Sequence, residues 1–188
     1  YIRVVDYKSG DKSYSPKDIK NGLGLQLLLY LFALCRADSP AYRRALGCSP
    51  QGKIYPAGAM YLSAKLPLIT VDEDITEDEI YRMAAEQIKR SGPLLDDTEI
   101  LSAMNDSLDT HFLAGNGKKK KVTDIKNLNS VEDFNALYDE IKETIVQITG
   151  RIRAGIAKAE PMTLNGTSPC KYCPYTGVCR SARADGDF

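Results

Sequence analysis

The apolar positions near the start of the chain are grouped in the way that a β-strand requires. The β-branched residues of the segment IRVV at 2–5 favour extended backbone, and Ser9-Gly10 supplies a stop. Residues 58–64 (GAMYLSA) predict a second strand, and residues 68–71 (LITV) are a candidate for a third. The first two of these strands are separated by a segment long enough to hold a helix between them.

Longer apolar segments have helical character. Residues 23–37 are rich in leucine, and their length favours a buried helix over a strand. Thr76 is followed three residues later by Glu79, a capping box that predicts a helix from this point to Gly92. The last long helix is predicted over about 131–155, where apolar residues recur at intervals of three and four.

Shorter elements fill the remaining chain. Ser15-Pro16 is typical of a helix start, with the serine as the cap and the proline in the first turn. A further short helix is predicted over residues 96–106. Residues 38–57 predict a loop around one helical turn, and residues 113–130 predict a second loop.

The composition is that of an ordinary globular domain. Hydrophobic residues make up 43% of the 188 residues and charged residues 27%, so one domain with one core is the default. Lys and Arg together number 25, as do Asp and Glu, so the net charge names no partner and any nucleic-acid surface must be local. No apolar run is long enough for a membrane span and no signal peptide is visible, so we expect a cytoplasmic protein without a membrane partner. Tyr1 stands in place of a start methionine, which indicates a piece of a longer chain.

Two pairs of polar side chains fall where chemistry is possible. Asp6 and Lys8 are two apart on the first strand and therefore project from one face. Gln26 and Tyr30 are four apart in the apolar helix and therefore share one face of it. Each pair also has a plain structural interpretation, the first as an exposed ion pair and the second as two groups that satisfy each other's hydrogen bonds.

Three cysteines lie close together near the end of the chain, at Cys170, Cys173 and Cys179, and the other two lie far upstream. This spacing suggests a shared ligand role. A disulfide is disfavoured because nothing indicates secretion. Zinc is an alternative, although the one imidazole of the chain, His111, lies in a different segment.

The combination resembles the PD-(D/E)xK nuclease superfamily in its RecB-like branch, which has an acid-x-Lys on a strand and Gln-x-x-x-Tyr on the next helix. The resemblance implies an α/β fold of the restriction-endonuclease-like type, a mixed central sheet flanked by helices, here truncated on its N-terminal side and followed by a cysteine-rich tail. It also implies hydrolysis of phosphodiester bonds, with Asp6 and the backbone carbonyl of Tyr7 as ligands of Mg²⁺. Lys8 would position the attacking water, help to deprotonate it, or hold the scissile phosphate. Gln26 and Tyr30 would complete the catalytic group and contact the DNA backbone.

The resemblance also implies parts that lie before Tyr1. The superfamily places another acid on an earlier strand, so we expect the present chain alone to hold metal poorly and to be inactive. RecB-like nucleases of several kinds carry a 4Fe-4S cluster on cysteines spaced as Cys170, Cys173 and Cys179 are, with a fourth cysteine far upstream. Because thiolates suit such a cluster, the resemblance implies the same ligands here.

Nearly the whole chain resembles one family of this branch, the nuclease domain of AddB (RexB), the B subunit of a bacterial ATP-dependent helicase–nuclease. The resemblance implies a nuclease core over residues 1–160 with a helical insertion at about 72–130, and an iron–sulfur tail over 161–188. It implies an AddA-like helicase–nuclease subunit as partner. The reaction implied is exonucleolytic cleavage of unwound single-stranded DNA during double-strand break processing for recombinational repair.

Other interpretations stay open. A protein that keeps the nuclease fold without the upstream acid would be a non-catalytic DNA-binding module. A chain whose cysteines bind zinc and whose acid-x-Lys is a surface ion pair would be a zinc-stabilised interaction domain. A run of four lysines is a weaker candidate for contact with DNA, because a glycine-flanked run is more often a solvated loop; it comprises Lys118, Lys119, Lys120 and Lys121.

Overall fold

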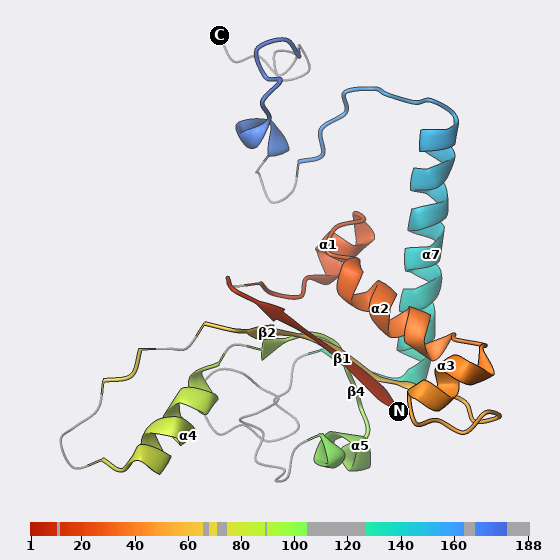
Figure 1. The fold of residues 1–188 in the computed structure, drawn as a ribbon. Helices are drawn as coiled ribbons and strands as arrows, with labels where there is room; N and C mark the ends of the chain where they lie inside the picture. The colour runs from red at the N-terminus through yellow and green to blue at the C-terminus, as the bar shows by residue number, and fades with distance from the viewer. Residues whose placement is uncertain are drawn as a thin grey trace. The chain divides into compact units, whose positions relative to one another are not determined.

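The computed structural model describes most of the chain (Figure 1). Two compact units divide it, Tyr1–Ile145 and Val146–Phe188. Among the described helices, none combines the length and the apolar composition that a membrane span requires. The described residues are 1–10, 12–65, 68–70, 75–88, 90–104, 127–163 and 168–179.

A mixed sheet runs through the first unit. Strands β1 (Ile2–Lys8) and β2 (Pro56–Ser63) are parallel, which requires the long connection that lies between them. Two short strands, β3 (Arg90–Ser91) and β4 (Leu94–Leu95), pair with β2 in the antiparallel direction, and β5 (Leu128–Asn129) pairs in parallel with β4. The mixed sheet with flanking helices confirms the predicted fold class.

Strand β1 lies at the edge of this sheet. The described strands follow the order β1-β2-β4-β5, with β3 beside β2. Within the described residues, β1 therefore pairs only with β2, in a register that sets Asp6 beside Tyr61 and Lys8 beside Ser63. The other edge of β1 presents backbone N–H and C=O groups that a further strand can bind.

Local sequence signals explain the helices that follow β1. Helix α1 (Pro16–Lys20) begins as predicted, with the Ser15 side chain accepting a hydrogen bond from an N–H of the first turn. Helix α2 (Gln26–Cys35) begins later than predicted because Gly24 has φ +67°, a left-handed conformation that glycine tolerates and a helix excludes. The predicted helical turn in the following loop is α3 (Pro40–Ala45).

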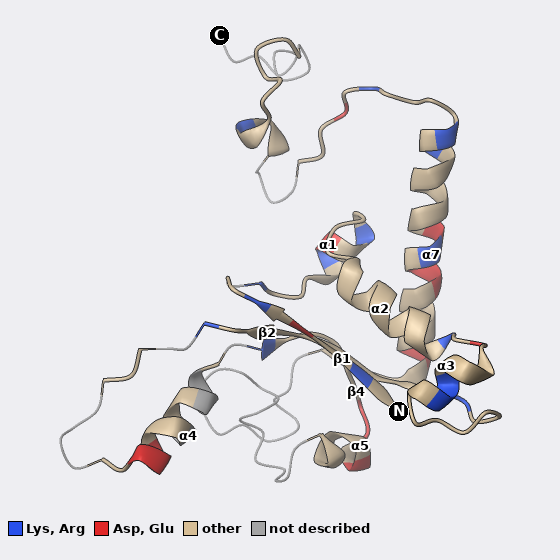
Figure 2. Ribbon diagram, in the orientation of Figure 1, with Lys and Arg blue, Asp and Glu red and all other residues tan. Residues whose placement is uncertain are grey.

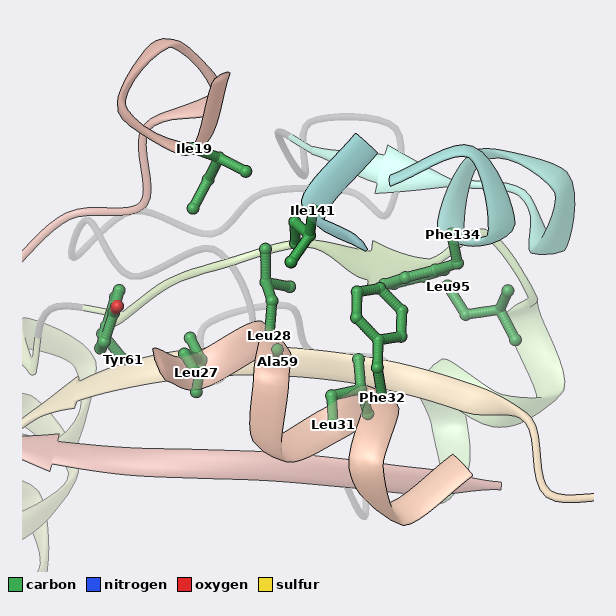
Figure 3. Close-up of a cluster of buried hydrophobic side chains, with 10 residues drawn as sticks. All are labelled: Ile19, Leu27, Leu28, Leu31, Phe32, Ala59, Tyr61, Leu95, Phe134 and Ile141. Carbon is green, nitrogen blue, oxygen red and sulfur yellow. The ribbon is translucent and has the colours of Figure 1, made fainter. Parts of the chain in front are cut away.

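The main core forms where α2 packs on one face of the sheet (Figure 3). The first half of helix α7 (Val131–Arg153) joins it through Phe134 and Ile141, which are 1% and 2% exposed. Figure 3 shows the buried side chains of α2 directed at those of β2 and α7. The buried members of the cluster are Ile19, Leu27, Leu28, Leu31, Phe32, Ala59, Tyr61, Leu95, Phe134 and Ile141.

A smaller cluster covers the opposite face of the sheet. Met60 projects from β2 to this side, since neighbouring residues of a strand alternate between faces. It packs against Leu94 of β4 and Leu101 of helix α5 (Thr98–Ala103). The sheet therefore has a helix layer on each side, as the predicted fold requires.

The predicted helix after Thr76 is correct at its start and wrong at its end. The capping box forms in both directions, and α4 (Glu77–Gln87) follows it. Residues 90–91, however, belong to β3 rather than to this helix. The chain then crosses close to β2 at Gly92, where an added Cβ would lie 2.8 Å from the carbonyl carbon of Ala59. Glycine is needed at that crossing, and it does not mark a helix end.

Two other predictions need correction. Residues 68–70 of the candidate third strand are not in a strand, and residue 71 lies outside the described residues. The end of the predicted loop 113–130 contains β5, and most of that loop lies outside the described residues. The short helix predicted over 96–106 is observed as α5 in its described part.

The second unit begins within α7, which occupies the range predicted for the last long helix. Arg151 near the end of α7 forms an ion pair with Glu160 at 2.9 Å. A short 3-10 helix, η2 (Pro169–Tyr172), follows, and the Ser168 hydroxyl caps it by accepting the N–H of Cys170 at 3.2 Å.

Candidate active site

Asp6 and Lys8 meet at the end of β1. Lys8 Nζ lies 2.8 Å from Asp6 Oδ2, and the two side chains are 33% and 21% exposed. Both share a face of the strand with Ile2 and Val4, which pack against the core beneath α2. The pair therefore lies on the α2 side of the sheet. On this face of β1, the apolar residues Ile2 and Val4 are followed by the charged residues Asp6 and Lys8.

Gln26 and Tyr30 form the second pair, on the first turns of α2. Gln26 Nε2 donates a hydrogen bond to the Tyr30 hydroxyl at 2.8 Å, as their four-residue spacing allows. Neither side chain is used in the core, and Tyr30 is 51% exposed. The amide and the phenol are therefore held together and open to solvent.

Electrostatics connect the two pairs. The hydrogen bond to Asp6 raises the pKa of Lys8, and this exceeds the opposing effect of desolvation. Smaller contributions in the same direction come from the phenols of Tyr61 and Tyr30, so both phenols lie near the ammonium group. Lys8 is thus a proton-bearing cation between a carboxylate and the exposed face of α2.

Tyr61 of β2 is a residue that motif-based reasoning missed. It is 5% exposed, stands beside Asp6 in the sheet register, and donates its hydroxyl to the Gly24 carbonyl at 3.3 Å. Burial raises the pKa of its phenol. The available signal was the alternation of the second strand, which places Tyr61 on the same buried face as Ala59.

The remaining predicted residues fall elsewhere. The Tyr7 side chain projects from the other face of β1 and is 67% exposed, so its backbone carbonyl is the part available to the site. Cys170, Cys173 and Cys179 lie in the second unit. The four lysines of the predicted DNA contact, Lys118, Lys119, Lys120 and Lys121, lie outside the described residues.

Metal ligands are incomplete in the described part of the chain. No group of three or more His, Cys, Asp or Glu side chains there is gathered closely enough to hold a metal ion. Asp6 offers one carboxylate, partly exposed at a strand end, and the adjoining peptide carbonyl is a second oxygen donor. Oxygen donors are the type that Mg²⁺ prefers, so the residues present fit such an ion in kind but not in number.

A cavity of about 630 Å³ opens at the other end of α2. Its lining includes Arg36, Arg43 and Lys53 together with Phe134 of α7. Asp6, Lys8, Gln26 and Tyr30 do not line it. The candidate site is therefore an open surface at the end of a strand rather than this hollow.

The fold is that of a known superfamily of nucleases. Residues 1–180 match the model of the PD-(D/E)XK nuclease superfamily, and the chain belongs to this superfamily. The resemblance predicted from acid-x-Lys and Gln-x-x-x-Tyr is therefore confirmed.

Several curated proteins are similar over nearly the whole chain, and all of them are B subunits of an ATP-dependent helicase/deoxyribonuclease. The protein from Alkaliphilus metalliredigens is 29% identical over 183 residues, and the one from Clostridium perfringens is 31% identical over 185 residues. The protein from a Thermoanaerobacter species is 31% identical over 183 residues. Each match covers 96% of this chain and 15% of the relative, so the chain spans about a seventh of their length. The predicted resemblance to this family of B subunits is confirmed.

Proposed function

We propose that this chain is the nuclease domain of the B subunit of a helicase–nuclease, and that it hydrolyses phosphodiester bonds of unwound single-stranded DNA. The observation that carries the proposal is the Asp6–Lys8 ion pair of 2.8 Å at the end of β1, on the face of the sheet against which α2, with its exposed Gln26–Tyr30 pair, packs. The similarity to B subunits supports an AddA-like partner and a role in double-strand break processing for recombinational repair, in the cytoplasm.

The chain's residues would divide the work as follows. Asp6 would hold a divalent ion such as Mg²⁺ together with the Tyr7 carbonyl, and such an ion supplies an activated water and neutralises charge on the phosphate. Lys8 would then donate from its ammonium group to the attacking water or to a phosphate oxygen. In its ammonium form Lys8 has N–H donors and no acceptor, which suits a donor better than a base.

Gln26 and Tyr30 would orient the DNA strand. Both lie at the start of α2 and are exposed, so their amide N–H and hydroxyl groups can reach phosphate oxygens. Their mutual hydrogen bond fixes their geometry before substrate arrives, which lowers the entropy lost on binding.

A second acid would come from an earlier part of the protein. β1 has a free edge among the described strands, and the curated relatives are several times longer than this chain. A strand added at this edge would place its side chains beside Asp6. We propose that it carries the missing carboxylate, so that the isolated chain is inactive and the longer protein is not.

The cysteines would form a separate, structural site. Cys170, Cys173 and Cys179 lie within ten residues of one another, and the Cys173 N–H donates to the Cys170 carbonyl at 3.2 Å in a tight turn. We propose that they bind a 4Fe-4S cluster together with a cysteine supplied upstream. Iron and sulfide analysis of the purified full-length protein tests this, and stoichiometric zinc without iron would contradict it.

The test of the nuclease is made in the full-length complex with its helicase partner. Asp6→Asn and Lys8→Ala should each abolish cleavage of one DNA strand and leave unwinding intact. Asp38→Asn is the matched control, because Asp38 is exposed and lines the cavity at the other end of α2. Full cleavage of both strands by Asp6→Asn would remove the catalytic assignment.

A further inference from the structure

Tyr61 lies between two ammonium groups. Lys8 Nζ and Lys12 Nζ are each 5.8 Å from the centre of its ring. The face of an aromatic ring carries negative potential and attracts cations at this range. The two ammonium groups therefore lie no further apart than twice that distance, beside one buried ring.

The two lysines differ in their other partners. Lys8 is paired with Asp6, whereas Lys12 is exposed and forms no ion pair with any described residue. Carboxylates accompany both cations: Asp6 pairs with Lys8, and Asp18 lines a small hollow with Lys12 and Tyr61. Because Lys12 forms no ion pair with a described residue, its exposed ammonium group is open to an anion. Figure 2 shows that Lys and Arg positions and Asp and Glu positions are both spread over several of the drawn elements.

The Tyr61 ring is fixed in place on two sides. Its side chain is 5% exposed within the core cluster, and its hydroxyl donates to the Gly24 carbonyl, two residues before Gln26. The ring therefore lies near Lys8 at the end of β1 and Lys12 beyond it, and it contacts the turn that leads into α2. A leucine of similar size would fill the space but would offer no face that attracts a cation.

We infer that Lys12 is a phosphate-contacting residue of the substrate strand, and that Tyr61 is the positioning residue that places Lys12 beside Lys8. The ligand is the phosphodiester backbone of single-stranded DNA, which the paired cations would contact at one phosphate or at neighbouring phosphates. This inference deepens the proposed function and rests on it.

Binding measured without hydrolysis tests the role of Lys12. The probe is a single-stranded oligothymidylate, bound to the full-length chain in excess EDTA over a range of salt concentrations. Loss of one phosphate contact lowers the slope of log K against log salt by about 0.7. Lys12→Gln should show this loss. Lys53→Gln is the matched control, an exposed lysine at the far end of α2 that should leave the slope unchanged. Equal slopes for Lys12→Gln and the unmodified protein would overturn the inference.

Substitutions at Tyr61 test the positioning role. Tyr61→Phe keeps the ring and should keep the salt slope. Tyr61→Leu should lower the slope as Lys12→Gln does, and adding Lys12→Gln to it should lower the slope no further. If Tyr61→Leu melts early, Tyr61→Met replaces it, because methionine also lacks a ring and adapts better to a core site, and it should lower the slope in the same way. A normal slope for a folded Tyr61→Leu variant would refute the positioning role.

Failure of this inference is distinguishable from failure of the proposed function. Asp6→Asn reports on hydrolysis, whereas the salt slope of Lys12→Gln reports on strand binding in the absence of metal. An inactive Asp6→Asn variant with an unchanged slope for Lys12→Gln would support the nuclease assignment and refute the Lys12 contact. An active Asp6→Asn variant with a lowered slope for Lys12→Gln would refute the catalytic assignment and support the Lys12 contact.

Discussion

Gly92 is the position where a single added carbon should disturb the sheet that supports the site. A Cβ at Gly92 would fall on the carbonyl oxygen of Ala59, 2.8 Å from its carbonyl carbon and 2.9 Å from the Cα of Met60. All of these atoms are backbone, so no side chain can rotate away. Gly92→Ala must therefore move the crossing chain away from β2, which also strains the bond from the Ala59 N–H to the Pro93 carbonyl at 3.0 Å.

The expected loss combines two terms. Overpacking of a tight core position costs about 1 to 3 kcal/mol, and a lost backbone hydrogen bond costs about 0.5 to 1.5 kcal/mol. A destabilisation of about 2 to 4 kcal/mol lowers the melting temperature of a chain of this size by roughly 5 to 15 °C. Thermal melting followed by far-UV circular dichroism measures it.

Gly150 supplies the matched control for this substitution. It lies within α7, and a Cβ there would meet nothing within 4 Å. Gly150→Ala should therefore raise stability by about 0.5 to 1 kcal/mol, because alanine has the higher helix propensity. A Gly92→Ala chain that melts at or above the unmodified chain would refute the steric reasoning.

Three further predictions concern the fold and its thiols. Phe134→Ala should lower the free energy of unfolding by about 3 to 5 kcal/mol in urea titration. Val146 is 60% exposed on the same helix, so Val146→Ala should cost little, and equal effects would contradict the assigned core. Asp97→Ala should lower the free energy of unfolding by about 1 kcal/mol in the same assay, because the Asp97 carboxylate accepts hydrogen bonds from two N–H groups at the start of α5. An unchanged stability would show that this cap does not stabilise the helix. Burial raises the pKa of Cys35 to about 11, so at pH 8 the Cys35 thiol should react with iodoacetamide far more slowly than the exposed Cys173. The reaction rate of Cys35 should rise with pH up to about 11, and similar rates for the two thiols at pH 8 would contradict this prediction.

The parts of the site that could be predicted are those whose geometry is local. Asp6 and Lys8 share a face because strand side chains repeat every two residues, and Gln26 and Tyr30 share one because helix side chains repeat about every four. Both predictions needed only the type of the element and its approximate position. The left-handed conformation of Gly24 makes α2 begin later than predicted, but Gln26 and Tyr30 remain on one face of the helix.

The parts that could not be predicted depend on long-range register. Tyr61 stands beside Asp6 because β1 and β2 pair in parallel with one particular alignment, which no local pattern encodes. Strands β3, β4 and β5 have two residues each, too few to show a period. These strands form because their backbones pair with β2 or with each other, which local propensity does not show, and residues 90–91 and 128–129 were predicted as helix and loop.

The residues that carry the proposed chemistry come from three elements, β1, α2 and β2. Asp6, Lys8, Gln26 and Tyr30 lie on the first two, and Tyr61 on β2 contacts the turn that leads into α2. Parallel pairing of β1 with β2 and the packing of α2 across both fix the relative positions of these side chains. Segments after β2 act on the site through β2 and through α2, because β3 and β4 pair with β2 among the described strands and α7 packs against α2 in the main core. Only β2 pairs with β1 among the described strands, so the other edge of β1 is the place where a further strand could add a ligand beside Asp6.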